Sequence, residues 1–547
     1  MLIRNHDVLH CDVLVVGGGG AGLRASIAAR SKGADVLLVS KTRVGVNTNT
    51  YLSKAVIAST GWGPPADDEN VHIVDTVVGG RFLNDQSMVA NIARGIHREV
   101  AFLQDCGACF ETVAGKLRVI QTAGHQYPRH VHGANWVGSD LVTPLVKRAQ
   151  QLGVRIAEHV FVTRLFTDAN RIVGAAGVDA DGRFWAIQAK TVVLATGGYA
   201  QIYRNTNNVP GITGDGQALA YHLGVALKDM EFLQFYPTAT GKRGSRLILY
   251  ERILAQPGVR LHNRQGQDIL KAHGITDPTA VTRDHLAQVI YREISATSSP
   301  EGEVFLDTQG LPEENARQLT VLLPVRWWAG EKTFKVVPTT HFCMGGVVTD
   351  PYGETSIKGL FAIGELSAGA HGANRLGGNA LAEIFTMGER GGEAAARRAM
   401  DMPSVSVSRS VFEEESHRLE AVHSHHGLRV KELTARLKTL MWNNVGVVRH
   451  LQGLKQALDQ LGENSTQATV TTPAELIRYL EYENMRCVAA MVCRAALERT
   501  ESRGSHCRSD FPEEDSQKWM KNIVLRKTDD GLYLEKIPVR LDRVAMP

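Results

Sequence analysis

The sequence predicts an α/β protein with a Rossmann-like dinucleotide-binding domain, a second domain inserted into it and a helical C-terminal part. Three observations support this fold class. A glycine turn lies between an apolar strand and a run of helix-forming residues at residues 12–30. Between about residues 229 and 337 the composition shifts towards Arg, Gln and Pro, with less regular patterning. Over residues 411–461 and 473–499, apolar residues recur at helical spacing.

The segment DVLVVGGGGAGLRAS, at residues 12–26, carries the most informative local motif. Its apolar, β-branched residues predict a buried strand over residues 13–16. Gly17, Gly19 and Gly22 then fit G-x-G-x-x-G, in which the first glycine permits a tight turn, the second lets the backbone approach a pyrophosphate and the third packs helix against strand. The helix N-terminus offers N–H groups and a positive dipole end to phosphates. The alternative interpretation is a glycine-rich turn that binds nothing.

The remaining elements follow in order. A strand at residues 35–39 places Ser40 and Lys41 where the dinucleotide pattern usually has an acid for the ribose. A strand at residues 191–200 ends in glycines. Strands of this kind return the chain beneath a bound dinucleotide. Asp215 precedes a helix at residues 217–223, either as its cap or as part of a ligand-facing turn. We also expect a loop at 41–59, helices at 92–103, 141–152 and 379–390, strands at 160–166, 172–178, 184–189 and 360–363, and a linker at 403–410.

Composition excludes several classes of function. The chain has 547 residues, a formal net charge of +4 and a pI of about 8.6. This mild charge does not indicate a nucleic-acid-binding protein, which needs clustered basic residues. No run approaches the ~18 apolar residues of a membrane span, so we expect no direct span. Because the first strand begins within a dozen residues of Met1, we expect no signal peptide and a cytoplasmic protein, peripheral to a membrane only through a partner.

The cysteines and histidines do not predict a metal site. Among seven cysteines only Cys106 and Cys109 form a C-x-x-C, which favours two ordinary thiols over a redox dithiol and is insufficient for a zinc or iron–sulfur site. His125, His130 and His132 lie in one polar segment without carboxylates nearby. For them we expect a solvated or phosphate-facing loop rather than metal ligands.

Segments along nearly the whole chain resemble the flavoprotein subunits of succinate dehydrogenase and fumarate reductase, together with L-aspartate oxidase. They run in family order from residue 13 to residue 515. The matching segments are VVGGGGAGLRAS, ATGGYAQIYRNTN, TGDG, MEFLQFYPT, TRD, VFLDTQGL, PTTHFCMGGVVTD, GLFAIGE, HGANRLGGNALAE and ESRGSHCRSDFPEED. The resemblance implies an FAD-binding domain at residues 1–229 and 338–405, an inserted α+β capping domain at 230–337, and a C-terminal helical domain with its tail at 410–547.

The resemblance and the glycine motif together indicate the residues that bind FAD. Asn49 stands where the membrane complexes carry the histidine that binds FAD covalently, so we expect non-covalent FAD. The predicted cofactor residues are Gly17, Gly19, Gly20, Ala21, Gly22, Ser40, Lys41, Thr48, Asn49, Thr50, Ala195, Thr196, Gly197, Asp215, Glu365, Arg375, Asn379, Ala380 and Leu381.

The resemblance also implies the chemistry, a hydride transfer between flavin N5 and a carbon next to a carboxylate or acyl group. Cations must polarise that group, and a proton donor or acceptor must serve the opposite face. By resemblance His341 and Arg375 hold one carboxylate and Arg283 is the proton shuttle. Glu251 is the acid retained from the family's proton-relay segment.

Several residues depart from the family pattern. In the relay segment an Arg and a Glu have become Leu254 and Gln256, and a Gln-Gly-Gly after the flavin loop reads Lys54-Ala55-Val56. A substrate-binding histidine has become Tyr236, and Tyr250 lies in the altered relay segment. A phenol brings no charge at neutral pH, and an uncompensated second carboxylate in a closed site is costly.

We therefore expect a substrate with one carboxylate or acyl group and an uncharged remainder, such as a substituted succinate, a thioester or an aryl-substituted acid. The alternative is an enzyme that has drifted in sequence and still uses fumarate. An iron–sulfur subunit or oxygen is the expected electron partner, since the chain has no cluster motif of its own. L-aspartate oxidase-like amine oxidation, or an electron-transfer module without substrate chemistry, are the rival interpretations.

Overall fold

The computed structural model describes residues 2–3, 8–242, 247–278, 281–296, 304–403, 407–462 and 467–546. The base of the molecule is a sheet whose central strands are parallel. β1 (Val8–Val16) pairs in parallel with β2 (Val36–Ser40) on one side and β10 (Phe184–Leu194) on the other. The sheet order is β7-β2-β1-β10-β9-β8, with β18 (Leu360–Ala362) also on β10. The residues of β2 are fully buried, as expected for a parallel strand covered on both faces.

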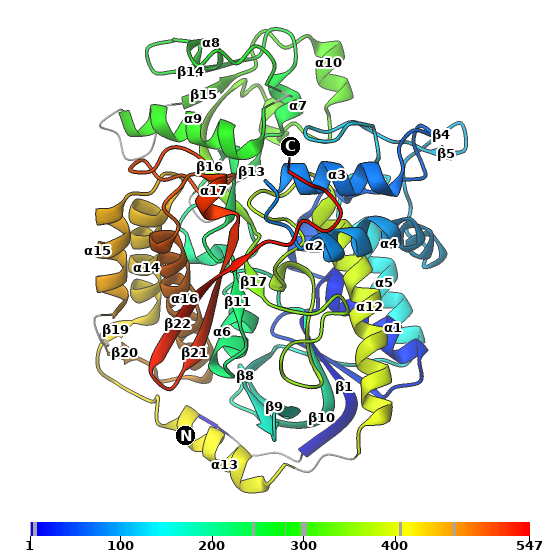
Figure 1. The fold of residues 1–547 in the computed structure, drawn as a ribbon, viewed down its shortest axis with the longest axis vertical. Coiled ribbons are helices and arrows are strands. Elements are labelled where there is room, and N and C mark those ends of the chain that lie inside the picture. Colours follow the sequence, from blue (N-terminus) through cyan, green and yellow to red (C-terminus); the bar gives the residue numbers. More distant parts are fainter. Residues whose placement is uncertain are drawn as a thin grey trace.

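The N-terminal part consists of this sheet and of the helices and short strands around it (Figure 1). Besides the strands above they are α1 (Gly20–Ser31), α2 (Asn49–Leu52), β3 (Val56–Ala58), α3 (Glu69–Gly79), α4 (Gln86–Asp105), β4 (Thr112–Val113), β5 (Lys116–Leu117), β6 (His130–His132), α5 (Ser139–Gln151), β7 (Arg155–Glu158), β8 (Val160–Asp168), β9 (Arg171–Asp179), the 3-10 turn Ala200–Ile202, α6 (Asp215–His222) and β11 (Leu227–Lys228). The expected α/β fold class is confirmed.

Two sequence-based details need correction here. The strand expected at residues 184–189 and the first part of the strand expected at 191–200 form one continuous strand, β10, which ends at Leu194. The loop expected at 41–59 contains α2 and β3, and β3 pairs with β6. Short elements of this kind are set by the tertiary pairing and not by local periodicity.

The middle segment lies at one end of the molecule, drawn in green at the top of Figure 1. Its elements are β12 (Leu233–Thr240), β13 (Leu247–Ile248), α7 (Glu251–Leu254), β14 (Arg260–Asn263), α8 (Ile269–Ala272), α9 (Arg283–Ala296), β15 (Val304–Asp307), α10 (Glu313–Gln318), α11 (Val325–Trp328) and β16 (Thr333–Cys343). Strands β12 and β16 pair along most of their length. The expected domain limit at 337/338 therefore falls inside β16, and the domain limits stay a prediction.

After β16 the chain returns to the base and then builds the C-terminal part. The elements are β17 (Gly346–Val347), β18, the 3-10 turn Gly364–Leu366, α12 (Asn379–Asp401), α13 (Arg409–Glu420), β19 (Leu428–Arg429), α14 (Val430–Val445), α15 (Leu451–Gly462), β20 (Ala468–Thr469), α16 (Pro473–Glu498), α17 (Ser516–Trp519), β21 (Lys521–Thr528) and β22 (Gly531–Pro538). The hairpin β21–β22 was not predicted, and β21 pairs with β11 from a segment almost 300 residues earlier. The expected linker at 403–410 overlaps residues outside the described part, and α13 already begins at Arg409.

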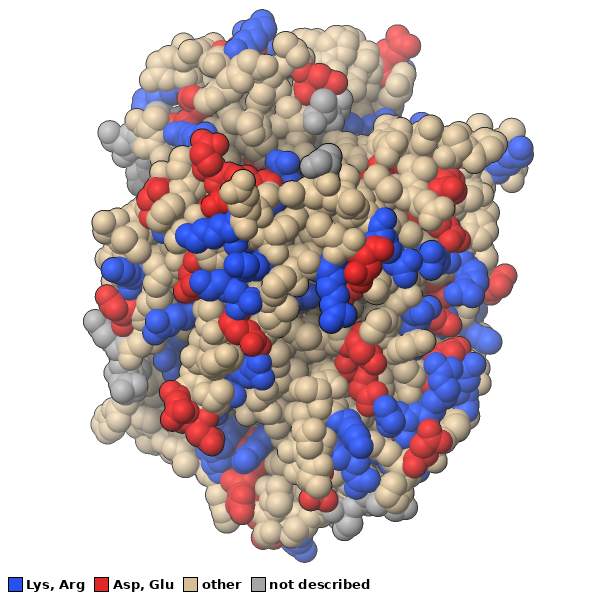
Figure 2. All heavy atoms as spheres, viewed as in Figure 1, with Lys and Arg blue, Asp and Glu red and all other residues tan. Residues whose placement is uncertain are grey.

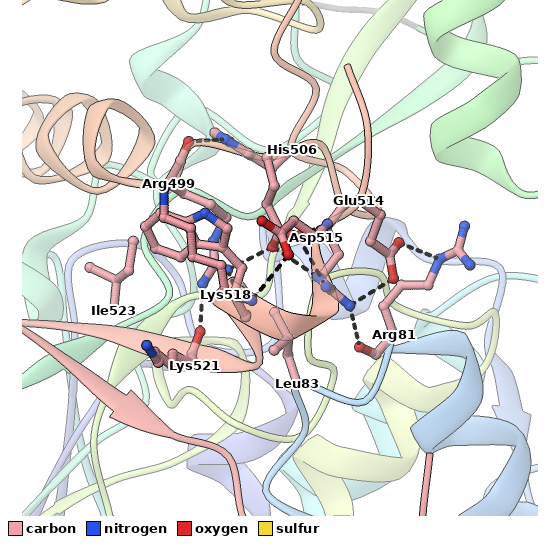
Figure 3. A network of polar contacts seen from close by, with 12 residues as sticks. Arg81, Leu83, Arg499, His506, Glu514, Asp515, Lys518, Lys521 and Ile523 are labelled. Atoms are coloured by element: carbon pink, nitrogen blue, oxygen red, sulfur yellow. Dashed lines mark hydrogen bonds and ion pairs between the residues drawn. The ribbon is translucent and has the colours of Figure 1, made fainter. Parts of the chain in front are cut away.

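A buried network of ion pairs joins the C-terminal segment to the rest of the molecule (Figure 3). Glu501 accepts hydrogen bonds from Arg499 (2.9 Å) and, at both carboxylate oxygens, from Arg503 (2.8 and 3.0 Å). Arg499 also donates to Glu231 at 2.7 Å. These four side chains are 0% exposed. Such pairs stabilise the structure only while both partners remain, because a lone buried charge is costly.

The surface has no single-sign charge field on the face seen in Figure 2, where Lys and Arg alternate with Asp and Glu. No helix among the described residues is both long enough and apolar enough to cross a membrane. In the described part of the chain, no cluster of three or more His, Cys, Asp or Glu side chains is arranged to hold a metal ion.

Candidate active site

A long cavity opens where the carboxyl ends of β1, β2 and β10 meet the N-terminus of α1. Its empty space is about 930 Å³, including the part open to solvent. This is where ligands bind in doubly wound α/β folds. Fourteen of the predicted cofactor residues line it: Gly17, Gly19, Gly20, Ala21, Ser40, Lys41, Thr48, Asn49, Thr50, Ala195, Thr196, Gly197, Asp215 and Glu365.

The glycine turn beside the cavity has no room for side chains at Gly17 and Gly22. A Cβ on Gly17, whose φ is +122°, would lie 2.2 Å from the carbonyl oxygen of Ala195. A Cβ on Gly22 would lie 1.8 Å from the carbonyl oxygen of Gly17. α1 begins after Gly19 without a side-chain cap, and the buried hydroxyl of Thr196, also on the cavity wall, has no partner among the described residues. The Gly20 N–H donates to Thr50 Oγ1 at 3.2 Å, while the other N–H groups of the first turn and the buried hydroxyl suit a ligand rich in phosphate and ribose oxygens.

Lys41 lies at the centre of a polar cluster on the cavity wall. Its Nζ donates to Thr213 (2.7 Å), Asp215 (2.6 Å) and Glu481 (2.7 Å). Burial disfavours the ammonium, but the two carboxylates outweigh it and raise the pKa of Lys41. Lys41 therefore stays charged and links the end of β2 to α6 and α16. Asp215 is one of its two carboxylate partners, and Glu481 is the other.

The acid Glu365 lies on the same cavity wall and is held by the backbone. Its Oε1 accepts from the amide of Cys343 at 3.1 Å. Burial raises the pKa of Glu365 to about 7. At neutral pH this carboxyl can both donate and accept hydrogen bonds, as a sugar hydroxyl requires.

Five predicted cofactor residues do not line the cavity: Gly22, Arg375, Asn379, Ala380 and Leu381. The Asn379 side chain turns to α3, where it donates to Thr76 (3.0 Å) and contacts Nε2 of His72 (2.9 Å). Leu381 is buried in the core beneath α12, and Ala380 packs against a neighbouring cluster.

A second group of side chains gathers between the base and the middle segment. Arg283, the first residue of α9, stacks over the Tyr236 ring of β12 with 4.8 Å between guanidinium carbon and ring centre. His341 of β16 packs edge-on against the same ring at 5.4 Å, and Tyr250 does so at 5.9 Å. Arg375 and Arg283 both lie close enough to influence the charge of His341. The fold thus brings together predicted residues that are spread along the chain from position 236 to position 375.

Gln234, which the sequence analysis did not single out, holds Arg375 in place. Arg375 Nη2 donates to Gln234 Oε1 at 2.8 Å, while Gln234 Nε2 donates to the Arg375 carbonyl at 2.8 Å and to Asn374 Oδ1 at 3.0 Å. The guanidinium also lies 4.6 Å from the Phe342 ring centre. Gln234 precedes Phe235 and Tyr236 in the quoted segment MEFLQFYPT, so its place in that motif was the available signal.

Burial determines the charge state of His341. Burial, then Arg375 and Arg283, hold the pKa of His341 well below its usual value. The ring is therefore neutral at pH 7 in the absence of an anion. Its Nδ1 contacts Asn207 Oδ1 at 3.2 Å, a residue of the RNTN segment to which the sequence analysis assigned no role.

Other predicted positions are placed as follows. Glu251 begins α7, but its side chain lies outside the described residues. Asn49 Nδ2 donates to Asn208 Oδ1, and its own Oδ1 accepts from the Val209 amide at 3.1 Å. Lys54 donates to the Val321 carbonyl of the middle segment at 2.8 Å.

The prediction of a solvated or phosphate-facing histidine loop was wrong. His125, His130 and His132 are all buried. Nε2 of both His125 (3.1 Å) and His130 (2.9 Å) contacts the Gly377 carbonyl, and since a carbonyl only accepts, each ring donates. Burial lowers the pKa of His130 to about 4. The pair is a neutral support for the loop that leads from Arg375 to α12, and the sequence alone carried no signal of this packing.

Comparison with known proteins identifies the family of this chain. The family model described as "FAD binding domain" matches residues 12–381, and that described as "Fumarate reductase flavoprotein C-term" matches residues 434–547. The chain is 34% identical to a subunit of the fumarate reductase (CoM/CoB) of Methanothermobacter marburgensis, over 96% of this chain and 99% of that protein. It is also 34% identical to L-aspartate oxidase of Mycobacterium bovis, over 95% and 96%.

Solved structures agree with the sequence relatives. Sdh1 of Mycobacterium smegmatis, solved in complex with UQ1, superimposes with a TM-score of 0.89 at 32% identity, covering 99% of this chain and 96% of that one. An E. coli quinol fumarate reductase flavoprotein chain gives a TM-score of 0.87 at 28% identity, covering 98% and 97%. The chain therefore belongs to the fumarate reductase and succinate dehydrogenase flavoprotein family, FAD-dependent oxidoreductases that act on CH–CH groups.

Proposed function

We propose that this enzyme interconverts the saturated and unsaturated forms of an acid that carries one carboxylate or acyl group beside the reacting carbons and an uncharged remainder. The observation that carries the proposal is the aromatic wall of Tyr236 and Tyr250. Tyr236 occupies the position at which the family resemblance expects a cationic histidine. An uncharged phenol offers a hydrogen bond and an aromatic face but does not compensate a second carboxylate.

The residues on the opposite side of the pocket would bind the first carboxylate. Arg375, fixed by Gln234, presents a guanidinium that can grip a carboxylate by two parallel hydrogen bonds. His341 lies beside it, and the positive field of the Arg375 guanidinium withdraws electron density from the neighbouring C–C bond. Arg283, stacked on Tyr236, is the residue that would deliver or remove a proton on the opposite face.

The residues around the long cavity would hold FAD, which supplies hydride transfer when bound. We propose that they do so without a covalent bond. Asn49 has no nucleophilic nitrogen, and its amide is already engaged by Asn208 and Val209. The backbone at Gly17–Gly19 and the acid Glu365 would take the pyrophosphate and a sugar hydroxyl. Precipitation of the protein with acid, followed by centrifugation, should leave the yellow colour in the supernatant; colour in the pellet would contradict this assignment.

We also propose that an iron–sulfur subunit exchanges electrons with the flavin, or that oxygen accepts them from it, since the described residues of this chain bring together no cluster ligands. Through such a subunit the protein would be peripheral to a membrane. Co-purification of this chain from its native source, with iron and acid-labile sulfide assayed in the complex, tests for an iron–sulfur subunit. Peroxide formation by the isolated chain tests for oxygen as the electron acceptor.

The substrate proposal is tested with a pair of probes that differ by one charge. Dithionite-reduced protein is mixed without oxygen with fumarate or with monomethyl fumarate, and reoxidation of the flavin is followed by absorbance. Since a hydrogen bond to a charged group is worth roughly 1.5–3 kcal/mol, we expect the monoester to react with a kcat/KM at least about tenfold higher. Tyr236→His restores a cation and should shift the preference back towards fumarate. Faster reaction with fumarate in the unaltered protein would overturn the proposal.

L-aspartate oxidase-like amine oxidation is the second candidate, because a relative of that name matches 95% of the chain. Incubation of the oxidised protein with L-aspartate distinguishes it. Bleaching of the flavin by aspartate, together with peroxide and oxaloacetate formation, would favour this candidate over the CH–CH substrate proposed above.

A further inference from the structure

A row of side-chain amides connects the cofactor cavity to the substrate pocket, and its hydrogen-bond direction can be determined. The Val209 amide, which can only donate, contacts Asn49 Oδ1 at 3.1 Å. The oxygen of Asn49 therefore faces Val209, and its Nδ2 donates to Asn208 Oδ1. Amide orientation is often ambiguous, but a backbone partner at one end removes that ambiguity.

The other end of the row is anchored in the same way. Asn208 Nδ2 donates at 2.8 Å to the His341 carbonyl, which can only accept. The same Nδ2 lies 3.3 Å from Asn207 Oδ1, so Asn207 presents its oxygen to this side. That oxygen also contacts His341 Nδ1 at 3.2 Å. Because an amide oxygen cannot donate, Nδ1 of His341 carries the hydrogen, and Nε2 of the neutral ring carries a lone pair.

The charges around the ring keep it in this neutral form until an anion arrives. Among the described residues, Arg375 faces it from the loop before α12 and Arg283 from α9, while Tyr236 packs against it from β12. Burial and the two arginines lower the pKa of His341. A lone pair on Nε2 and an anionic oxygen cannot form a hydrogen bond unless a proton is added between them.

We propose that His341 takes up one proton from solvent at Nε2 when the substrate carboxylate binds, and that Asn207 is the positioning residue that makes this uptake necessary by holding the ring as the Nδ1–H tautomer. The new bond is Nε2–H, no electrons are transferred, and the bound carboxylate stabilises the imidazolium. The inference rests on the proposed function, since it assumes that this pocket binds a carboxylate beside Arg375.

The consequence is a pH-dependent affinity. Between the pKa values of the free and the occupied site, one proton binds with each ligand, and the Kd should rise about tenfold per pH unit. The experiment is titration calorimetry of the oxidised, FAD-loaded protein with monomethyl fumarate, and with fumarate, at pH 7.5. Repeating it in two buffers of different ionisation enthalpy gives the number of protons taken up. We expect more than half a proton per site.

Asn207→Asp tests the positioning role with a nearly isosteric change. A carboxylate at this position still accepts from Asn208 and from His341 Nδ1, and it raises the pKa of the ring. His341 should then be charged before the ligand arrives, so proton uptake at pH 7.5 should fall close to zero and the Kd should vary less than about twofold between pH 6.5 and 8. Asn443→Asp, on the exposed face of α14, adds the same charge elsewhere and should behave like the unaltered protein.

The outcomes separate this inference from the proposed function. If neither probe binds, the proposed function fails. Binding by the unaltered protein without proton uptake would refute the inference while leaving the proposed function intact. Equal uptake by the unaltered protein and Asn207→Asp would also refute it, since the proton would then go to another group. If Asn207→Asp does not retain FAD, the pH profile of the unaltered protein decides alone.

Discussion

Replacing Gln234 by leucine should disable Arg375 without removing it. The substitution keeps the buried volume similar but deletes the acceptor of Arg375 Nη2 and the donors to the Arg375 carbonyl and to Asn374. A hydrogen bond to a charged group contributes roughly 1.5–3 kcal/mol. If that contribution is expressed in the transition state, kcat/KM falls by about 10-fold to 150-fold.

The assay is single-turnover reoxidation of the reduced protein by the better of the two fumarate probes, after flavin content and melting temperature have been matched. We expect the loss to appear mainly in KM, because Arg375 still carries its charge but no longer holds it in the carboxylate plane. Gln234→Glu retains an acceptor for Arg375 Nη2 and should recover at least part of the activity. Gln318→Leu, on the exposed side of α10, is the matched control.

A change in kcat/KM of less than about twofold for Gln234→Leu would refute this reasoning, since the clamp would then contribute nothing to binding or catalysis. An equal loss in Gln234→Leu and Gln234→Glu, with a lowered melting temperature in both, would assign Gln234 a purely structural role instead.

Three further changes probe stability and cofactor retention. Glu501→Gln removes the buried carboxylate that Arg499 and Arg503 share, which leaves each guanidinium with one remaining carboxylate partner, Glu231 or Glu514, and should destabilise the protein by about 3–5 kcal/mol in thermal or urea unfolding. Glu313→Gln breaks only an exposed pair and should leave the unfolding transition almost unchanged; similar effects would contradict the network. Gly22→Ala places a methyl group 1.8 Å from a turn carbonyl and should yield protein without FAD, while Gly462→Ala, which meets nothing within 4 Å, should retain it. Burial raises the pKa of Glu365 to about 7, so ionising this carboxyl destabilises the apoprotein as pH rises from about 4.5 to 7. Glu365→Gln should therefore raise the melting temperature of the apoprotein at pH 8 and change it little at pH 5, and equal shifts at both would disprove the assignment.

Much of the FAD site could be predicted from the sequence because its information is local. Strand, turn and helix follow one another within 20 residues, and a Cβ at Gly22 would clash with Gly17 of that same segment. Sequence spacing is sufficient for such a unit, and its helix and strands were placed nearly correctly. The departures at Asn49 and Tyr236 are equally visible in the sequence, because they are changes of residue type at motif positions.

Contacts between distant segments could not be predicted in this way. The clamp of Gln234 on Arg375 joins residues 141 positions apart, and the β21–β22 hairpin pairs with a two-residue strand near residue 227. Neither contact leaves a periodic trace in the chain, since each depends on one or two side chains or backbone groups. The buried histidines were misassigned for the same reason, because burial is a property of the packed molecule.

The amino-acid sequence by itself determined the family chemistry, since the glycine turn, the cationic residues and their replacements are matters of residue identity. Only the tertiary structure decided the charge state and the orientation of those residues: which nitrogen of His341 carries its hydrogen, which residue holds Arg375, and which carboxyls are buried. The physical reason is that hydrogen-bond direction and pKa depend on neighbours in space and on exclusion of water, and the chain acquires both only when it folds.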